Sequence, residues 1–413
     1  MEITGKLLLA ALKSGLKGER FTPEGSVSRD EWQKVINLSW QHHLLPLIFE
    51  AVYDTPGIQG TPIGDNARRQ ARQAVVGQTR KTTEFLELNR RLRGAGVTPL
   101  VVKGLVCREL YRMPDHRISG DEDVLIPQEQ YPVARRILEE FGMTAPQKEI
   151  SPERIQEIPW RKPGSPLFVE LHLNLFPPDS DAYGDLNGYF KDAFCRAEET
   201  ECHGERVLTM CPTDHLFYLI CHAFKHFLHA GFGIRQVCDI VLFGQRYDDR
   251  IDWAGVRKNC REIRADWFTA ALFAIGKNHL DLEHPRGYAR CWQDVTVDET
   301  PMLEDLLAAG VYGSAEEERL HSSNITLTAA ADQKSGKTRR SGLLQSLFPS
   351  ADSLKGRYPY LQKAPVLLPV AWVSRVVGYG RRHGKAAAAS ASESMRIGSH
   401  RVALMRQYGI LDE

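Results

Sequence analysis

Three short runs of mostly apolar residues, separated by two segments of helical character, constrain this 413-residue chain more than any other feature. The runs cover residues 97–103, 123–126 and 167–173, and the helical segments 104–112 and 130–141 lie between them. Short apolar runs with turn residues at their ends are typical of buried strands, and the third run also alternates in polarity. The strand–helix–strand–helix–strand order predicts a small α/β domain with one sheet.

The sequence on both sides of this core is dominated by helical patterns. Residues 38–52 and 214–228 are apolar at helical spacing, and 66–92 predicts a long polar–apolar helix. We therefore predict an α+β fold, in which a small mixed-sheet core is embedded in mostly helical N- and C-terminal regions. The predicted parts are a helical region 1–95, the α/β core 96–180, a helical domain 181–325 and a basic region 326–413 with a loop and terminal helices.

Composition excludes several classes of protein. Hydrophobic residues make up 42% and charged residues 25%, as in globular domains rather than disordered chains. The longest apolar runs are shorter than a membrane-spanning helix requires, and the N-terminus predicts a short amphipathic helix rather than a signal peptide. The eight cysteines form no CxxC pair, which argues against a zinc ribbon or a disulfide framework. We expect a reducing, cytoplasmic location.

Charge is unevenly distributed along the chain. The segment from Ala330 to Glu413 contains 14 Lys and Arg against 5 Asp and Glu, whereas the rest of the chain is acidic. This excess has two interpretations: a solvated basic surface, or contact with an anionic partner such as a membrane surface or another protein. A short amphipathic helix around 372–382 would favour contact with an anionic partner, whereas a helix docked on the protein itself would favour a solvated basic surface. Nucleic acid is not required by any feature of the sequence.

Three carboxylates form the sharpest candidate site. Asp121 and Asp123 stand two residues apart at the start of a predicted strand, so they point to one face. Glu170 lies inside another apolar strand, where a charge is unfavourable unless it is paired or binds a metal ion. Together they predict a site for Mg²⁺ or Mn²⁺, which prefer oxygen ligands. The alternative is a turn in which Arg117 pairs with the two aspartates.

The junction Lys103-Gly104 predicts a phosphate-binding position. It closes the first strand and opens the next helix, where backbone N–H groups are free to hold an anion. Glycine permits close approach, and lysine adds a positive charge. The alternative is an ordinary strand-to-helix turn.

Other side chains are weaker candidates for substrate contact. His172 shares the strand face of Glu170, and Arg117 would either neutralise phosphate or pair with Asp121. His222 and His226 are four residues apart on one helical face, with Lys225 beside them. This spacing can bind zinc, but there is no Glu between the histidines, so a metalloprotease site of the HExxH type is not supported. A nearby Asp239 is a candidate partner for one of the histidines.

These residues resemble a known family. The elements of the resemblance are Lys103-Gly104, Tyr111, Pro114, Arg117, Asp121-x-Asp123 and Val169-Glu170-Leu171-His172. They resemble the DNA polymerase β-type nucleotidyltransferase superfamily and, more narrowly, a bacterial group of uncharacterised nucleotidyltransferases. The resemblance extends from about residue 35 to 410 and includes the region around His222, Lys225 and His226.

The resemblance implies Mg²⁺-dependent transfer of a nucleoside monophosphate from an NTP, with ATP expected, to a hydroxyl or phosphate of an unknown acceptor. The acceptor would be a small molecule, a saccharide or a peptide. In this scheme Asp121, Asp123 and Glu170 hold metal, and Glu170 is also the candidate base. Two departures motivate an alternative, a catalytically inactive nucleotide-sensing or partner-binding module. Lys103-Gly104 replaces the usual Gly-Ser, and Glu122 replaces an apolar residue and needs a partner, for which Arg117 is a candidate.

Overall fold

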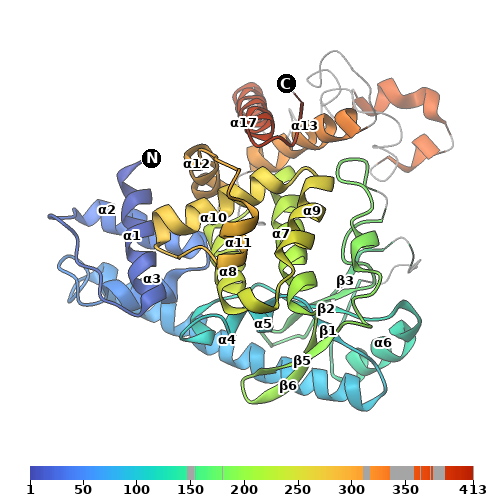
Figure 1. The fold of residues 1–413 in the computed structure, drawn as a ribbon, viewed down its shortest axis with the longest axis horizontal. Coiled ribbons are helices and arrows are strands. Elements are labelled where there is room, and N and C mark those ends of the chain that lie inside the picture. The colour runs from blue at the N-terminus through green and yellow to red at the C-terminus, as the bar shows by residue number, and fades with distance from the viewer. Residues whose placement is uncertain are drawn as a thin grey trace.

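The computed structural model is an α+β fold built around one six-stranded sheet (Figure 1). It describes residues 1–146, 155–178, 180–309, 317–334 and 387–412, together with Glu153, 358–362, 364–372 and Ser374. Within these residues, no helix is long and apolar enough to cross a membrane. The predicted fold class is confirmed.

The sheet combines three strands that were predicted with three that were not. In chain order the strands are β1 (Leu100–Val101), β2 (Glu122–Leu125), β3 (Glu157–Arg161), β4 (Phe168–His172), β5 (Glu198–Cys202) and β6 (Glu205–Thr209). Their spatial order is β3-β4-β2-β1-β6-β5. The β2–β4 and β1–β6 pairs are parallel and the other three are antiparallel, so the sheet is mixed as expected.

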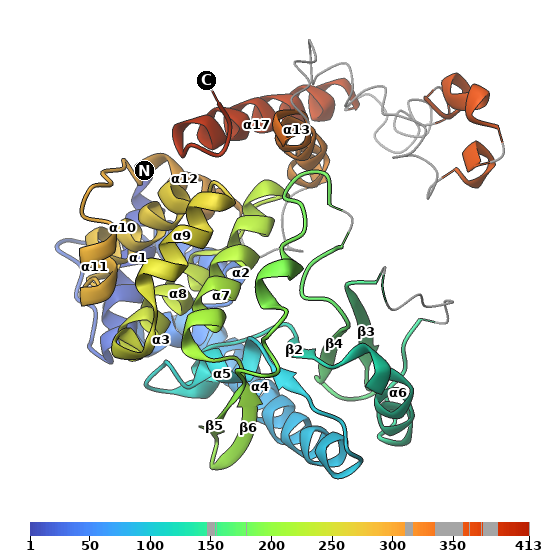
Figure 2. The ribbon, with the colours of Figure 1, turned by 45° about the vertical axis from the view of Figure 1, so that its right-hand side comes forward.

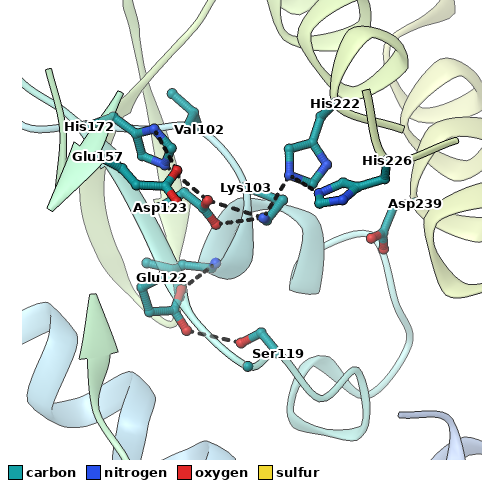
Figure 3. A network of polar contacts seen from close by, with 12 residues as sticks. Val102, Lys103, Ser119, Glu122, Asp123, Glu157, His172, His222, His226 and Asp239 are labelled. Carbon is teal, nitrogen blue, oxygen red and sulfur yellow. Dashed lines mark hydrogen bonds and ion pairs between the residues drawn. The ribbon is translucent and has the colours of Figure 1, made fainter. Parts of the chain in front are cut away.

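The two faces of the sheet have different surroundings because side chains alternate along each strand. Val124, Val169 and Leu171 belong to a core that also includes residues of the long helix α4 (Pro62–Gly94) and of α6 (Tyr131–Glu140). The opposite face carries polar side chains of β2 and β4 and lies across from helix α7 (Figure 3). One face of the central strands is therefore sealed, and the other is available for a site.

The remaining helices form one large core that joins both halves of the chain. The helices are α1 (Ile3–Lys17), α2 (Arg29–Gln41), α3 (Leu45–Val52), α5 (Gly104–Arg108), α7 (Pro212–Leu228), α8 (Ile234–Arg246), α9 (Trp253–Glu262), α10 (Asp266–Leu280), α11 (Arg286–Cys291) and α12 (Thr300–Ala309). Short 3₁₀ turns occur at Pro114–His116, Gln128–Gln130, Asn187–Phe190, Asp248–Arg250, Pro359–Gln362 and Pro365–Leu367. Side chains of α1–α3 and of α7–α10 pack in the same apolar cluster.

Two C-terminal helices, α13 (Glu317–Lys334) and α17 (Ala387–Gln407), lie side by side at the end of α7 (Figure 2). Their side chains bond the last carbonyl groups of α7, which have no partners inside that helix. Thr326 donates to the Leu228 carbonyl at 2.6 Å, and the buried Arg401 donates to the carbonyls of Phe227 and His229. This part of the basic region is docked on the protein itself. Most of the segment 372–382 lies outside the described residues, as does most of the predicted loop at 333–342.

Two predicted helices need correction. The apolar stretch 38–52 is not one helix, because α2 ends at Gln41 and α3 begins at Leu45. His43 has φ of 55° there, a left-handed conformation that a continuous helix does not allow. The helix predicted for 104–112 ends at Arg108.

The prediction of a helical domain at 181–325 missed the β5–β6 hairpin. Its turn is formed by His203 and Gly204, which have φ of 48° and 76°. Two positive φ values suit the tight turns that join antiparallel strands. Through β6 the hairpin extends the core sheet beside β1. Strand β3 was missed as well, and its Pro159 is tolerated because β3 is an edge strand.

Candidate active site

Asp123, Glu170 and His172 gather on the open face of the sheet. In the parallel pair β2–β4, Asp123 lies opposite Glu170 and Leu125 lies opposite His172. One ligand atom from each of the three side chains lies within 4.8 Å of the others. The prediction that the two strands bring their carboxylates together is confirmed. The structure adds His172 to the group, for which the sequence predicted contact with phosphate or acceptor, or orientation of Glu170.

Asp121 lies at the edge of this group rather than inside it. It lines the same cavity as Glu170, but its carboxylate is not part of the close cluster among the described residues. Within the described chain, the side-chain carboxylates of Asp121 and Glu170 have no hydrogen-bond or ion-pair partner. Among the described residues, two carboxylates without a direct ion-pair partner therefore lie near the buried Asp123.

Lys103 is the positive charge closest to Asp123. Its Nζ lies 3.1 Å and 3.0 Å from the two Asp123 oxygens and 3.2 Å from His222 Nε2 (Figure 3). Burial alone would lower the pKa of Lys103, but the charges of Asp121 and Asp123 raise it well above its ordinary value. Burial, together with Lys103, holds the pKa of His222 well below its ordinary value. Lys103 therefore donates as an ammonium, and neutral His222 accepts.

The three clustered side chains titrate in different directions. Burial and the charge of Asp123 raise the pKa of Glu170 to about 8. Burial opposes the charged form of Asp123, but Lys103 and His172 hold its pKa well below its usual range. Burial likewise opposes charging of His172, yet the hydrogen bond to Asp123 at 3.2 Å raises its pKa. A strongly ionised carboxylate thus lies beside one that is readily protonated, which suits proton transfer.

Glu122 points to the other face of β2 and has its own partners. Its Oε1 lies 2.7 Å from Arg108 Nη1 and accepts the Ser119 hydroxyl at 3.1 Å. Its Oε2 accepts the Leu105 N–H at 2.9 Å. The need for a partner is confirmed, but the expectation that Arg117 supplies it is wrong. Arg108 is one helical turn from the start of α5 and faces Glu122 directly.

Gly104 makes room for this carboxylate. A Cβ at Gly104 would lie 2.2 Å from Glu122 Oε2, and its φ of 38° favours glycine. The Leu105 N–H at the start of α5, where phosphate binding was expected, is therefore engaged by Glu122 within the protein.

Arg117 is buried, and its guanidinium pairs with Asp239 rather than with a group of the cavity. Its Nε donates to Asp239 Oδ1 at 3.1 Å, and Tyr111 donates to the same oxygen at 2.8 Å. Arg117 is 1% exposed and, within the described chain, is not part of the cavity wall. Asp239 therefore pairs with Arg117, and the expectation that it bonds a histidine of α7 is wrong.

The wall opposite the sheet comes from helices α7 and α8. The predicted His222, Lys225 and His226 all line the cavity, whose volume is about 360 Å³. His226 Nε2 lies 3.2 Å from His222 Nε2, and Lys225 donates to Gln156 at 3.1 Å. The zinc alternative finds no support among the described residues, because the only candidate metal group is the one on the sheet. This wall presents cationic and imidazole groups to the carboxylates.

Sequence reasoning missed three polar residues that shape the site. Glu157 on β3 has its Oε2 3.7 Å from His172 Nδ1. Lys81 and Gln78 on α4 are buried, and they bond the loop before β2. Lys81 donates to the Ser119 and Gly120 carbonyls, and Gln78 accepts the Ser119 N–H at 2.9 Å. Gln78 and Lys81 could have been recognised in the sequence, because they are polar residues three positions apart on the buried face of a long predicted helix.

The fold and the site together define a class of protein. A mixed sheet with acidic residues on adjacent strands, enclosed by helices, is consistent with a nucleotidyltransferase-type α+β core. The model of the uncharacterised nucleotidyltransferase family matches residues 28–280, more than half of the chain, and the protein belongs to that family. No curated protein matches the chain. No solved structure matches it either. Membership supports nucleotidyl transfer as the general activity.

Proposed function

We propose that the protein transfers a nucleoside monophosphate from an NTP, with ATP the expected donor, to a hydroxyl or phosphate of an acceptor. The observation that carries this proposal is a cavity lined by Asp121, Glu170 and Lys103, with the buried Asp123 in contact with Lys103 and close to Glu170. Transfer needs charge neutralisation and alignment more than covalent help from the protein. A cavity with acidic groups on one wall and basic groups on the other supplies both.

The residues present fit a divalent cation such as Mg²⁺ or Mn²⁺. Asp121, Asp123 and Glu170 would hold it, since Asp121 and Glu170 have no cationic partner of their own among the described residues. When bound, the ion neutralises phosphate charge and favours attack by the acceptor oxygen.

The protein's own groups have separate roles in the proposed reaction. Lys103, with Lys225 and Arg235 on the helical wall, binds the triphosphate oxygens. Arg235 takes the role on the cavity wall that the sequence suggested for Arg117. The acceptor oxygen attacks the α-phosphorus, its proton passes to Glu170, and the bond to pyrophosphate breaks. The raised pKa of Glu170 suits a group that receives a proton during the reaction.

The test is pyrophosphate release from each NTP with Mg²⁺ or Mn²⁺, with cell extract as a source of acceptor. We expect release that disappears in the double variant Asp121→Asn/Asp123→Asn. Ser119→Ala serves as the control, because its side chain lies on the sealed face of β2. Release that persists in the double variant, or no release and no metal-dependent NTP binding by the wild type, would reject the proposal.

One observation favours the alternative of a nucleotide-binding module without catalysis. Lys103 contacts both oxygens of Asp123 and so competes with a cation for that carboxylate. If Lys103 keeps this position, the protein would bind NTP without releasing pyrophosphate. In that case Lys103→Met would weaken NTP binding, and no choice of metal or acceptor would give turnover.

A further inference from the structure

His172 is placed as a metal ligand rather than as a phosphate contact. It is 2% exposed, and its Nε2 points to Asp123 Oδ1 at 3.2 Å on the face that also carries Glu170 (Figure 3). Only the edge of this buried imidazole is accessible to a substrate in the cavity. A cation held by Asp123 and Glu170 would lie within reach of its Nε2.

The far nitrogen of His172 is held in the manner of a ligating histidine. Nδ1 lies 3.4 Å from the Asn174 carbonyl and 3.7 Å from Glu157 Oε2. Both groups accept, so Nδ1 can keep its proton when a cation takes the place of the proton between Nε2 and Asp123. Metal-ligating histidines usually donate their second ring N–H to a carbonyl or a carboxylate in this way, which fixes the ring and strengthens the ligand.

The charges around His172 leave room for a dication. Three carboxylates face it, namely Asp123, Glu157 and Glu170. Within the described residues, Lys103 is the only ammonium within ion-pair distance of any of them. By direct contact, Lys103 offsets only Asp123 among these carboxylates. The ligand atoms lie within 4.8 Å of each other, slightly more than twice a metal–ligand bond of about 2.1 Å. A small inward movement of the side chains would seat the ion.

We infer that this site takes a first-row transition ion, Mn²⁺ foremost, in preference to Mg²⁺, with Asp123, Glu170 and His172 as its protein ligands. Imidazole suits transition ions, whereas Mg²⁺ favours an all-oxygen shell and retains its waters. Asp121, outside the close group, remains available to an ion that arrives with the triphosphate. Because the site is the same, this inference rests on the proposed function and specifies its cofactor.

The experiment measures ion binding directly. Full-length protein freed of metal is titrated with Mn²⁺, free Mn²⁺ is followed by electron paramagnetic resonance, and bound Mn²⁺ is then displaced with Mg²⁺. We expect one Mn²⁺ per chain and displacement only when Mg²⁺ exceeds Mn²⁺ by more than about tenfold. Displacement at equal concentration, or no Mn²⁺ binding, would overturn the inference. This comparison uses wild-type protein and does not depend on a variant that folds.

Variants then assign the ligand. His172→Gln should weaken Mn²⁺ binding by at least about tenfold, and Glu157→Gln by a similar factor through loss of the group that orients the ring. His172→Glu should abolish the preference for Mn²⁺ over Mg²⁺, because all ligands are then oxygen. His229→Gln is the matched control, since it lines the cavity outside the metal group and should leave binding unchanged. Circular dichroism and the thermal midpoint confirm folding. Unchanged Mn²⁺ affinity in a folded His172→Gln would overturn the ligand assignment.

The two proposals fail in different ways. Loss of Mn²⁺ binding in His172→Gln without any pyrophosphate release by the wild type keeps the metal site and rejects the proposed reaction. Pyrophosphate release that is equally fast with Mg²⁺, together with an ion affinity independent of His172, keeps the reaction and rejects this inference.

Discussion

Glu122 and Asp123 are neighbours on one strand, yet their carboxylates lie in opposite environments. Glu122 is fully buried and has a cation and two further donors, all from the protein. Asp123 is equally buried, but its ammonium partner Lys103 borders the cavity, and two unpaired carboxylates lie nearby. Both carboxylates form ion pairs in the protein interior. Only the Asp123 pair borders the cavity, where a bound cation can replace Lys103 as the partner of the carboxylate.

The difference shows how burial alone fails to distinguish structural from functional charge. A buried carboxylate whose two oxygens are both bonded within the protein gains little from a cation, because its acceptors are already used. A buried carboxylate in a group of like charges is satisfied only when a cation arrives. The completeness of the partner set, rather than exposure, separates the sealed face of β2 from the open one.

The largest effect should come from breaking the sealed pair. Glu122→Gln leaves the Arg108 guanidinium buried without a counter-charge, and we expect the free energy of unfolding to fall by about 4 kcal/mol. Urea unfolding measures this loss. The double variant Glu122→Gln/Arg108→Met removes the orphan charge and should recover part of the stability. A double variant no more stable than the single one would show that the pair is not the source of the effect.

Asp123→Asn should give the reverse pattern. We expect pyrophosphate release to fall roughly 10²- to 10³-fold, equivalent to about 3–4 kcal/mol of transition-state stabilisation. The free energy of unfolding should fall less than in Glu122→Gln, because Lys103 borders the cavity and keeps the nearby charge of Asp121. Initial rates and urea unfolding on the same preparation check both parts. A large loss of stability would place Asp123 in the same category as Glu122.

Local sequence patterns were sufficient for the acidic wall of the site. The strand–helix–strand order predicted β2 and β4 as strands of one sheet, and their pairing brings Glu170 to Asp123. Asp121, which precedes β2, lines the cavity but lies outside the close group. These inferences rest on the two-residue alternation of side chains along a strand and on the short connection between neighbouring strands.

The same patterns could not identify the partners of the charges. Arg117 pairs with Asp239, 122 residues later, and Lys103 meets His222 across 119 residues. Such contacts depend on how α7 and α8 pack on the sheet, which no local period encodes. Glu157 was missed because Pro159 argues against a strand at that position, and its place beside His172 depends on the register of β3 and β4.

Acidic pH should lower the stability of the contact between helix α7 and the residues that follow strand β1. His215 on α7 lies 2.7 Å through Nε2 from the Val102 carbonyl, next to Lys103, and burial lowers its pKa to about 4. The unfolded chain binds a proton near pH 6.5 and the folded chain only near pH 4, so stability present above pH 6.5 is lost as the pH falls. His215 alone should contribute a loss of about 2 kcal/mol at pH 5 relative to pH 7.

This pH dependence can be assigned by comparing unfolding at the two pH values. A His215→Gln variant that folds should show a smaller decrease between pH 7 and pH 5 than the wild type. His279→Gln, at a partly exposed site beside Glu299, is the control and should retain the wild-type decrease. An equal decrease in His215→Gln would mean that other groups cause the acid sensitivity.

The smallest expected effect tests whether the sealed face is independent of the reaction. Ser119 accepts a hydrogen bond from Arg108 at 2.8 Å and donates one to Glu122 at 3.1 Å, so Ser119→Ala removes two bonds but leaves the ion pair. We expect the free energy of unfolding to fall by about 1 kcal/mol, the net contribution of a typical buried hydrogen bond. Pyrophosphate release should stay at the wild-type rate, because Lys81 and Gln78 hold the loop through the Ser119 backbone, which the substitution does not touch. A rate that falls with stability unchanged would instead mean that the two faces of β2 act as one unit, since the loop that carries Asp121 would then depend on the side chain beneath it.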